Sequence, residues 1–253
     1  MKFLKIHGTE NDFVFFDTSE ITNEEVFVKQ IPEICHRRVG VGADGVVVIA
    51  KMSNYYEWKY YNSDGSAAEF CGNAVRCAGA YIKETYGDQG EIKLKTDVGT
   101  IRIDSLDHSN FKAHLSFQAQ ILKKIEVQGH ESYLCQAGVP HVVILTPTQG
   151  RGELLKVAQD VRSSGETYST WNITFVKSGE PTQAVTFERG VEDFTQSCGS
   201  GAISAAYVVM STKQSDKVII KMPGGLIKVD KVEGGTLLEG LAEIAFSGHW
   251  RLT

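Results

Sequence analysis

The sequence predicts an α+β fold of two similar halves, because two motifs occur twice in the same order and strand patterns outnumber helices. The segments "CGNAVRCAGAYI" from Cys71 and "CGSGAISAAYVV" from Cys198 share Cys-Gly-(Asn/Ser) followed by small residues. Downstream, "KTDVGTIRID" and "KMPGGLIKVD" share a glycine turn and an alternating strand, at nearly equal separations from the two cysteines. Such a repeat indicates a duplicated domain. Each half is predicted to be a curled, mostly antiparallel sheet around a central helix, the two halves being pseudo-symmetric.

Helical patterns are found near residues 23–36, 72–86, 152–162 and 199–212, and Gly87 is suited to end the second of these helices. Alternating or β-branched runs predict strands at residues 3–6, 13–17, 46–50, 56–61, 91–96, 100–106, 112–117, 141–145, 173–177, 184–188, 217–222 and 226–232. We expect an N-terminal half over residues 1–116, to which residues 242–253 return, and a C-terminal half over 117–241.

Composition excludes several classes of function. The chain has 253 residues, of which 42% are apolar, enough for a sizeable core without disulfide staples. The chain has 31 acidic and 26 basic residues, which gives a net charge of -5, and it contains no dense basic run. We therefore expect no nucleic-acid partner. The sequence shows neither the pattern of a signal peptide nor an apolar run long enough for a membrane span. A cytoplasmic protein with no membrane association is therefore expected.

The cysteines and histidines predict neither a disulfide framework nor a metal site. Five cysteines are widely spaced, and their number is odd. The seven histidines do not lie at ligand spacing from a cysteine or from one another. We expect no metal and no cofactor.

A cysteine at the start of a helix, present twice, suggests acid/base chemistry. A helix N-terminus presents unpaired N–H groups and a partial positive charge, which bind a carboxylate and stabilise a thiolate. Gly72 and Gly199 allow a ligand to approach the backbone closely. Two such helix starts facing each other give the geometry of a two-base racemase, in which one thiolate removes an α-proton and the opposite thiol returns one. Cys35, Cys77 and Cys135 are better explained as inert, buried cysteines.

The chain resembles the diaminopimelate epimerase family over nearly its whole length. The matching motifs are "KIHGTENDFVFFD", "HRRVGVGADGVVVI", "YYNSDGSAAEFCGNAVRC", "VPHVVIL", "FERG", "SCGSGA" and "MPGG", in family order. The resemblance implies two pseudo-symmetric domains with the active site in the cleft between them. It further implies cofactor-independent epimerisation of LL-diaminopimelate to meso-diaminopimelate by a two-base thiol mechanism, in lysine and peptidoglycan precursor biosynthesis.

Carried over residue by residue, the resemblance makes Cys71 and Cys198 the acid/base thiols. His141 occupies the place of a family histidine beside one catalytic cysteine, and Glu188 that of a group which binds substrate or tunes a thiol. The implied substrate-binding residues are Asn11, Gly72, Asn73, Gly199 and Ser200 for the reacting end, and Asn62, Asn172, Glu188 and Arg189 for the distal end.

Simpler interpretations exist for some of these residues. "NSDG" from Asn62 is strong turn chemistry, and "GADG" at 42–45 is best explained as a structural turn. A lone His141 after Pro140 is equally well explained as a structural residue. Glu188 and Arg189 also fit an ordinary surface pair.

Three positions depart from the family pattern. Val139 stands where the family has an asparagine before Pro-His, which removes a hydrogen bond to the distal group. Glu10 replaces a glycine before the first asparagine, and the segment "VEDFTQ" before Cys198 is one residue longer than usual.

Two alternatives stay open: the substrate is an amino acid other than diaminopimelate, or the protein is not an enzyme. Val139 motivates a racemase or isomerase of another amino acid on the same fold, whereas a non-enzymatic thiol switch would leave the duplicated helix starts unexplained. The expected partner is a small amino-acid substrate, and the sequence leaves the oligomeric state open, with a homodimer as one candidate.

Overall fold

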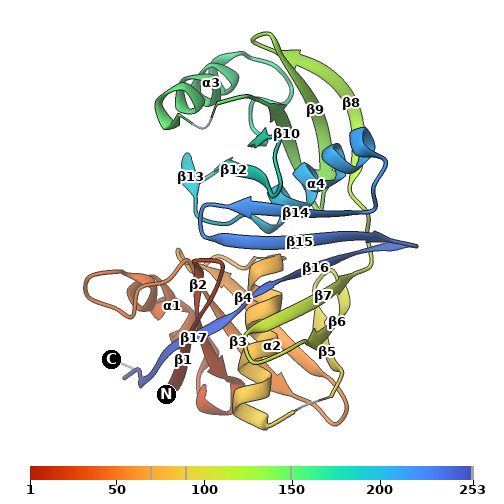
Figure 1. Ribbon diagram of the computed structural model, residues 1–253. Helices are drawn as coiled ribbons and strands as arrows, with labels where there is room; N and C mark the ends of the chain where they lie inside the picture. The colour runs from red at the N-terminus through yellow and green to blue at the C-terminus, as the bar shows by residue number, and fades with distance from the viewer. Residues whose placement is uncertain (69, 89, 149, 252–253) are drawn as a thin grey trace. The chain divides into compact units, whose positions relative to one another are not determined.

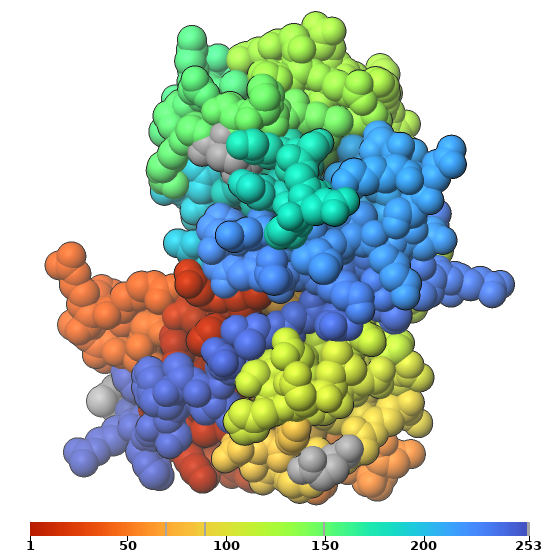
Figure 2. Space-filling view, viewed as in Figure 1, coloured from red at the N-terminus to blue at the C-terminus, as the bar shows by residue number. Residues whose placement is uncertain are grey.

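The computed structural model describes residues 1–68, 70–88, 90–148 and 150–251. The chain separates into two compact units, Met1–His114 with Glu239–Thr253, and Leu115–Leu238. The sequence analysis places these boundaries at 116/117 and 241/242. The colours of Figure 2 show the C-terminal segment on the same unit as the N-terminal segments.

In the first unit, strands wrap a central helix, α2 (Figure 1). The helices are η1 (Thr18–Glu20), α1 (Glu24–Cys35) and α2 (Gly72–Tyr86). The strands are β1 (Lys2–Gly8), β2 (Asn11–Asp17), β3 (Gly45–Lys51), β4 (Tyr56–Asn62), β5 (Ile92–Thr96), β6 (Gly99–Ser105), β7 (Asn110–Leu115) and β17 (Glu243–His249). α2 contacts β1, β2, β3, β5, β6 and β17, so its whole circumference is covered through most of its length.

In the second unit, strands wrap α4 in the same way (Figure 1). The helices are α3 (Arg151–Ser163) and α4 (Gly199–Lys213). The strands are β8 (Gln120–Val127), β9 (His130–Ala137), β10 (Val139–Leu145), β11 (Asn172–Lys177), β12 (Thr182–Glu188), β13 (Asp193–Thr195), β14 (Lys217–Met222) and β15 (Gly225–Val232). β16 (Gly235–Leu241) follows β15 and spans the boundary between the units.

The two units have the same topology. In the first, neighbouring strands run β17, β1, β2, β3, β4, β5, β6, with β2–β3 and β4–β5 parallel and the other pairs antiparallel. In the second, they run β8, β9, β10, β11, β12, β14, β15, with β10–β11 and β12–β14 parallel. α1 and α3 connect the first parallel pair of each unit, and α2 and α4 the second. The predicted pseudo-symmetric α+β fold is confirmed.

Small residues let the central helices approach the sheets closely. A Cβ atom on Gly79 would lie 2.8 Å from Phe111 and 2.9 Å from Ile103. On Gly201 it would lie 2.3 Å from Thr186 Oγ1. Both contacts are shorter than packed atoms allow, so glycine is required at each position. A helix covered on all sides also explains why these segments lack a polar face.

The predicted helices all form, and α2 has the predicted bounds. Gly87 ends α2 in the left-handed conformation, with φ 68°. The strands missing from the prediction are β8, β9, β13, β16 and β17. β8 and β17 are exposed along nearly their whole length, so they carry no clear alternation of apolar and polar residues.

The turn between β1 and β2 contains two residues with positive φ, neither of which is glycine. Thr9 and Glu10 both have positive φ, 51° and 66°, and Gly8 pairs with Asn11 across the turn. Two central residues with positive φ are typical of a tight hairpin turn that favours glycine. Glu10 therefore adopts the conformation that glycine provides at lower cost, and Asn11 starts β2 in register.

Glu10→Gly should stabilise the protein by roughly 0.5–1 kcal/mol, because it removes left-handed strain at an exposed position. Chemical denaturation of the two proteins measures the difference. Glu10→Ala is the matched control, since it removes the side chain and keeps the strain. If the glycine variant and the wild type have equal free energies of unfolding, the left-handed conformation of Glu10 does not destabilise the protein.

Candidate active site

Cys71 and Cys198 occupy the same position at the start of equivalent helices. Each is the N-cap residue, with extended backbone at φ −147° and ψ 117° for Cys71 and φ −121° and ψ 109° for Cys198. The first intrahelical bonds join Val75 N–H to Cys71 O (3.0 Å) and Ala202 N–H to Cys198 O (2.9 Å). The N–H groups before them point out of the helix end, where the dipole favours negative charge. Each unit thus carries one thiol beside an anion-binding helix terminus.

The structure brings Cys71, Asn11 and Asn73 together. The Cys71 thiol donates to Asn11 Oδ1 at 3.5 Å, and Asn73 Nδ2 donates to the same oxygen at 3.1 Å. Asn73 is buried and Asn11 half-buried. Three of the predicted residues of this unit therefore form one polar cluster at the start of α2.

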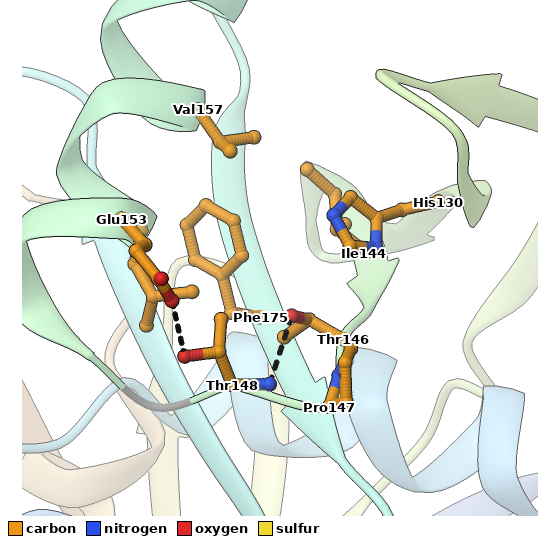
Figure 3. Close-up of a pocket in the computed structure, with 9 residues that line it drawn as sticks. His130, Ile144, Thr146, Pro147, Thr148, Glu153, Val157 and Phe175 are labelled. Atoms are coloured by element: carbon orange, nitrogen blue, oxygen red, sulfur yellow. Dashed lines mark hydrogen bonds between the residues drawn. The ribbon is translucent and has the colours of Figure 1, made fainter.

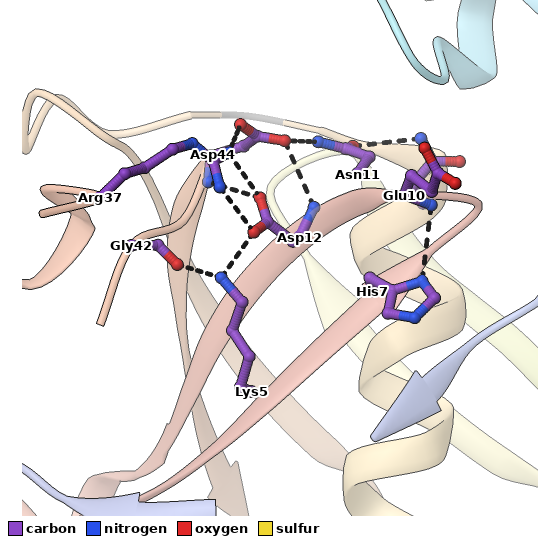
Figure 4. Close-up of polar contacts among 9 residues, drawn as sticks. Lys5, His7, Glu10, Asn11, Asp12, Arg37, Gly42 and Asp44 are labelled. Carbon is purple, nitrogen blue, oxygen red and sulfur yellow. Dashed lines mark hydrogen bonds and ion pairs between the residues drawn. The ribbon is translucent and has the colours of Figure 1, made fainter. Parts of the chain in front are cut away.

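Asp44 fixes the orientation of the Asn11 amide (Figure 4). Asn11 Nδ2 donates to Asp44 Oδ2 at 2.7 Å, and Arg37 Nη2 donates to Asp44 Oδ1 at 2.6 Å. Because an ionised carboxylate only accepts hydrogen bonds, the Asn11 nitrogen must face Asp44 and its oxygen must face Cys71. The "GADG" turn thus contacts the site, which the sequence did not reveal because Asn11 begins β2 and Asp44 lies 33 residues later, directly before β3.

Opposite charges hold this cluster together (Figure 4). Arg37 binds both carboxylate oxygens of Asp12, at 3.0 and 2.9 Å, and Lys5 binds Asp12 at 2.6 Å. Although burial raises the pKa of Asp12, the hydrogen bonds from Arg37 and Lys5 lower it to about 2. Burial and the charge of Asp12 raise the pKa of Asp44.

Asn62 lies at the end of β4 and has an exposed side chain. Its Nδ2 donates to Ser66 Oγ at 3.0 Å, and Gly65 N–H donates to Asn62 O at 3.0 Å. The structure therefore shows Asn62 as a residue of the turn that follows β4. Its contact with a substrate stays a prediction.

Cys198 is more enclosed than Cys71, with 7% of its surface exposed. Its thiol lies 3.5 Å from Ser200 Oγ. Burial raises the pKa of Cys198 well above its usual range, and the negative charge of Glu188 raises it further. Thr195 on β13 donates a 2.5 Å hydrogen bond to Glu188 on the paired strand β12.

His141 reaches Cys198 through Ser200. Its Nε2 lies 2.9 Å from Ser200 Oγ, and its Nδ1 lies 3.0 Å from Thr174 Oγ1. Burial and the positive charge of Arg189 lower the pKa of His141 to about 3, so the imidazole is neutral at physiological pH. A neutral imidazole between two hydroxyls fixes their orientation, which places His141 as a positioning group for Ser200.

Asn172 and Arg189 are in contact, through the side chain of Asn172 and the backbone of Arg189. Asn172 is buried, and its Oδ1 accepts the Arg189 N–H at 3.0 Å. The Arg189 side chain is exposed and lines a surface hollow of about 600 Å³ with Arg162, Ser169, Thr170, Gly190 and Glu192. Asn172 therefore holds the backbone from which Arg189 projects.

Arg162 connects the two loops around this hollow, although no sequence motif predicts this role. Its Nη1 donates to the carbonyls of Ser169 (2.7 Å) and Trp171 (2.5 Å). Its Nε donates to Glu192 Oε2 at 2.9 Å. One guanidinium thus joins the loop before Asn172 to the turn after Arg189.

A second hollow, of about 560 Å³, lies between α3 and the ends of β10 and β11 (Figure 3). Ile144, Val157 and Phe175 form apolar walls. Thr148 donates to Glu153 at 2.5 Å and to Thr146 Oγ1 at 3.3 Å, the second bond through its backbone N–H. None of the predicted site residues lines this hollow, and Thr146, Thr148 and Glu153 bind one another.

None of the five cysteines is in a disulfide, and no group of three or more His, Cys, Asp or Glu suited to a metal ion occurs among the described residues. No helix within the described ranges is long and apolar enough to cross a membrane.

The comparison with known families decides the identity of the fold and of the repeated motifs. The model of the diaminopimelate epimerase family matches residues 3–114 and 133–243. The chain belongs to the diaminopimelate epimerase family. The resemblance of the sequence motifs to this family is thereby confirmed, and both cysteine-bearing helix starts fall within the matched segments.

Curated members of the diaminopimelate epimerase family align along nearly the whole chain. The diaminopimelate epimerase of Methanopyrus kandleri is 37% identical over 260 residues, which cover 99% of this chain and 89% of the relative. That of Flavobacterium psychrophilum is 34% identical and covers 97% of this chain and 98% of the relative.

Solved structures share the fold at low sequence identity. A PhzF-family phenazine biosynthesis protein from Enterococcus faecalis has a TM-score of 0.77 at 11% identity and covers 99% of both chains. A hydroxyproline epimerase from Agrobacterium vitis has a TM-score of 0.68 at 13% identity and covers 98% of this chain and 91% of its own. The fold is therefore shared by proteins of different names.

Glu188→Gln should let Cys198 ionise at lower pH, because it removes the negative charge beside the thiol. In a Cys71→Ser background, we expect the pH midpoint of Cys198 alkylation by iodoacetamide to fall by roughly one unit. Mass spectrometry of the Cys198 peptide measures it.

Asp193→Asn is the control for this experiment. Asp193 pairs with Glu188 across β12 and β13, but it is half-exposed and binds Arg151. Its removal should leave the midpoint in place. A midpoint equal in Glu188→Gln and its parent would show that Glu188 does not act on the thiol.

Proposed function

We propose that the protein interconverts LL-diaminopimelate and meso-diaminopimelate by a cofactor-independent, two-base mechanism. The observation that carries the proposal is the pair of thiols at equivalent helix starts in a duplicated fold, Cys71 on α2 and Cys198 on α4. Membership of the diaminopimelate epimerase family supports the substrate. The reaction supplies lysine and peptidoglycan precursors.

The mechanism requires the two thiols to meet one α-carbon from opposite faces. A thiolate takes the α-proton and becomes a thiol, while the C–H electron pair moves into the carboxylate as an enolate. The opposite thiol then protonates the carbon with inverted configuration and becomes a thiolate. No external oxidant or reductant is consumed, and the reverse reaction exchanges the two roles.

The helix starts supply the stabilisation that such a carbanion needs. The α-carboxylate gains charge as the proton leaves, so N–H groups at its oxygens bind the transition state more strongly than the substrate. We assign this role to the amides of Gly72 and Asn73 on α2 and of Gly199 and Ser200 on α4. Asn11 completes the first of these sites through its contacts with Cys71 and Asn73.

The distal end of the substrate is assigned to Asn62, Asn172, Glu188 and Arg189. Arg189 suits a carboxylate, because its guanidinium fork binds two oxygens at once and its side chain is exposed. The contact between Asn172 and the Arg189 backbone supports a positioning role for Asn172.

Val139 is the reason to test amino acids other than diaminopimelate as substrates. It is the first residue of β10, as Asn11 is the first residue of β2, so it occupies the equivalent place in the second unit. An apolar residue there supplies no hydrogen bond to a polar distal group. The screen for substrate therefore includes other L-amino acids.

We further assign the protein to the cytoplasm, in line with five cysteines that form no disulfide. The small-molecule substrate is the partner that the proposal requires, and a homodimer is the proposed assembly. Size-exclusion chromatography with light scattering tests the latter.

Incubation with LL-diaminopimelate in deuterium oxide under reducing conditions should give meso product with deuterium at the α-carbon. Nuclear magnetic resonance follows the α-proton signal, and chiral chromatography follows the product. Exchange of the α-proton of another L-amino acid, without exchange in diaminopimelate, would assign that amino acid as the substrate. Absence of exchange with every amino acid would leave the thiol-switch alternative.

Cys71→Ser and Cys198→Ser should each lower kcat by at least about 100-fold, because each removes one partner of a proton transfer. Cys135→Ser is the matched control, since Cys135 is buried in β9 and has no role in the mechanism. Full activity of either catalytic-site variant would rule out the two-base assignment.

A further inference from the structure

Arg76, in the second turn of α2, has 0% of its surface exposed. A guanidinium stays charged inside a protein, and burial of a charge without a counter-ion is costly. None of the ion pairs among the described residues includes Arg76, and its Nε has no hydrogen-bond partner within that part of the chain. Among the described residues, Arg76 is thus a buried positive charge without a carboxylate partner.

The contacts of Arg76 lead to the start of α2. Its Nη2 donates to Asn73 Oδ1 at 2.8 Å, and its Nη1 lies 3.4 Å from Gly72 O. The third contact, at 3.4 Å, is to Thr9 Oγ1 in the β1–β2 turn. Gly72 and Asn73 directly follow Cys71, so the guanidinium polarises the amide groups that lie next to this thiol.

The Asn73 amide transmits this contact to the Cys71 thiol. Because Arg76 only donates, Asn73 must turn its oxygen to Arg76 and its nitrogen to Asn11. Asn73 Nδ2 then donates to Asn11 Oδ1, which faces Cys71. Arg76 at one end and Asp44 at the other therefore fix the direction of every bond in this chain.

The second unit shows that the fold does not require a cation here. Ile203 lies five residues after Cys198, as Arg76 lies five residues after Cys71, and it is likewise 0% exposed. An apolar side chain thus fills this position of the helix in an otherwise matching topology. Because the second unit folds with an isoleucine at this position, a role in folding that both units share does not explain why the first unit has an arginine.

The described groups around Arg76 do not supply a charge that compensates it. Burial raises the pKa of Cys77, the adjacent thiol, which stays protonated. On the other side of Asn11, the carboxylates of Asp12 and Asp44 are matched by the cations Lys5 and Arg37. 

Glu10, in the β1–β2 turn, is exposed, and the imidazole of His7 on β1 lies 3.8 Å from the Glu243 carboxylate. Among these described groups, Arg76 is the cation that is buried and joined to the amides beside Cys71.

We propose that Arg76 is a positioning residue that supplies the buried positive charge for the Cys71 half of the site, favouring the Cys71 thiolate and a carboxylate at the amides of Gly72 and Asn73. This rests on the proposed function and assigns that function a further residue. The two thiols then differ, since Cys198 has Glu188 beside it and an apolar Ile203 in the place of Arg76. The bond from the Cys71 thiol to Asn11 Oδ1 stabilises the protonated thiol, so the effect on the Cys71 thiolate is assigned to the positive charge of Arg76 and not to this bond.

Arg76→Met in a Cys198→Ser background tests this proposal without substrate. The pH dependence of Cys71 alkylation by iodoacetamide is followed from about pH 6 to about pH 10 by mass spectrometry of the Cys71 peptide. We expect the midpoint to rise by at least about one pH unit, which slows alkylation at neutral pH roughly tenfold. The assay needs no turnover, so its outcome is independent of whether diaminopimelate is the substrate.

Two controls separate charge from packing. Ile203→Met alters the equivalent position of α4 and should leave the Cys71 midpoint in place. Arg76→Lys keeps a positive charge and should retain most of the effect of the arginine. Circular dichroism and thermal unfolding establish that each variant is folded.

A folded Arg76→Met variant with the midpoint of its parent would overturn the proposal. If this variant does not fold, Arg76→Gln replaces it, because the amide keeps hydrogen-bond donors and loses only the charge; the same rise is expected. Failure of both neutral variants to fold, with Arg76→Lys folded, would assign the charge to folding and would equally overturn the proposal.

Discussion

The start of a helix inside a closed sheet is the constraint on which the rest of this structure depends. α2 and α4 are covered on all sides, so their first N–H groups have to be used by a cap, a ligand or a neighbouring side chain. Cysteine is the N-cap residue in both, and neither thiol caps the helix with a side-chain hydrogen bond. The close packing that makes this burial feasible explains Gly79 and Gly201, whose Cβ atoms would overlap the surrounding strands. Duplication of the unit therefore duplicates an anion-binding helix start with a thiol beside it.

Equivalent positions in the two units carry side chains of different chemistry. Asn11 begins β2 and binds Cys71, whereas Val139 begins β10. β4 ends in Asn62, a neutral residue, and β12 ends in Glu188, whose charge raises the pKa of Cys198. The shared topology thus places each thiol at the start of an equivalent helix, while the neighbouring side chains, which differ between the units, determine whether the thiol is protonated. A two-base reaction uses such a difference, because one thiol must be charged when the other is protonated.

Sequence reasoning predicted what local chemistry determines. The small-residue run after Cys71 and the left-handed Gly87 determined the bounds of α2, and the repeated motif revealed the duplication. Strands exposed along their length, such as β17, carry no pattern to read. At the site, the cysteines were identifiable, but the bond from Asn11 to Asp44 joins residues 33 apart and depends on the parallel register of β2 and β3. Arg76 lies three residues after Asn73, a helical spacing at which contact is expected, and its burial became evident only from the wrapped helix.

The central claim is that both thiols act on one carbon. A crystal structure of the protein with bound meso-diaminopimelate tests it most directly. The account predicts that Sγ of Cys71 and Sγ of Cys198 lie on opposite faces of one α-carbon, each within roughly 3.5 Å of it, with the α-carboxylate at the N–H groups that start α2 and α4. A fully bound substrate whose α-carbon contacts one thiol, with the other directed elsewhere, would contradict it.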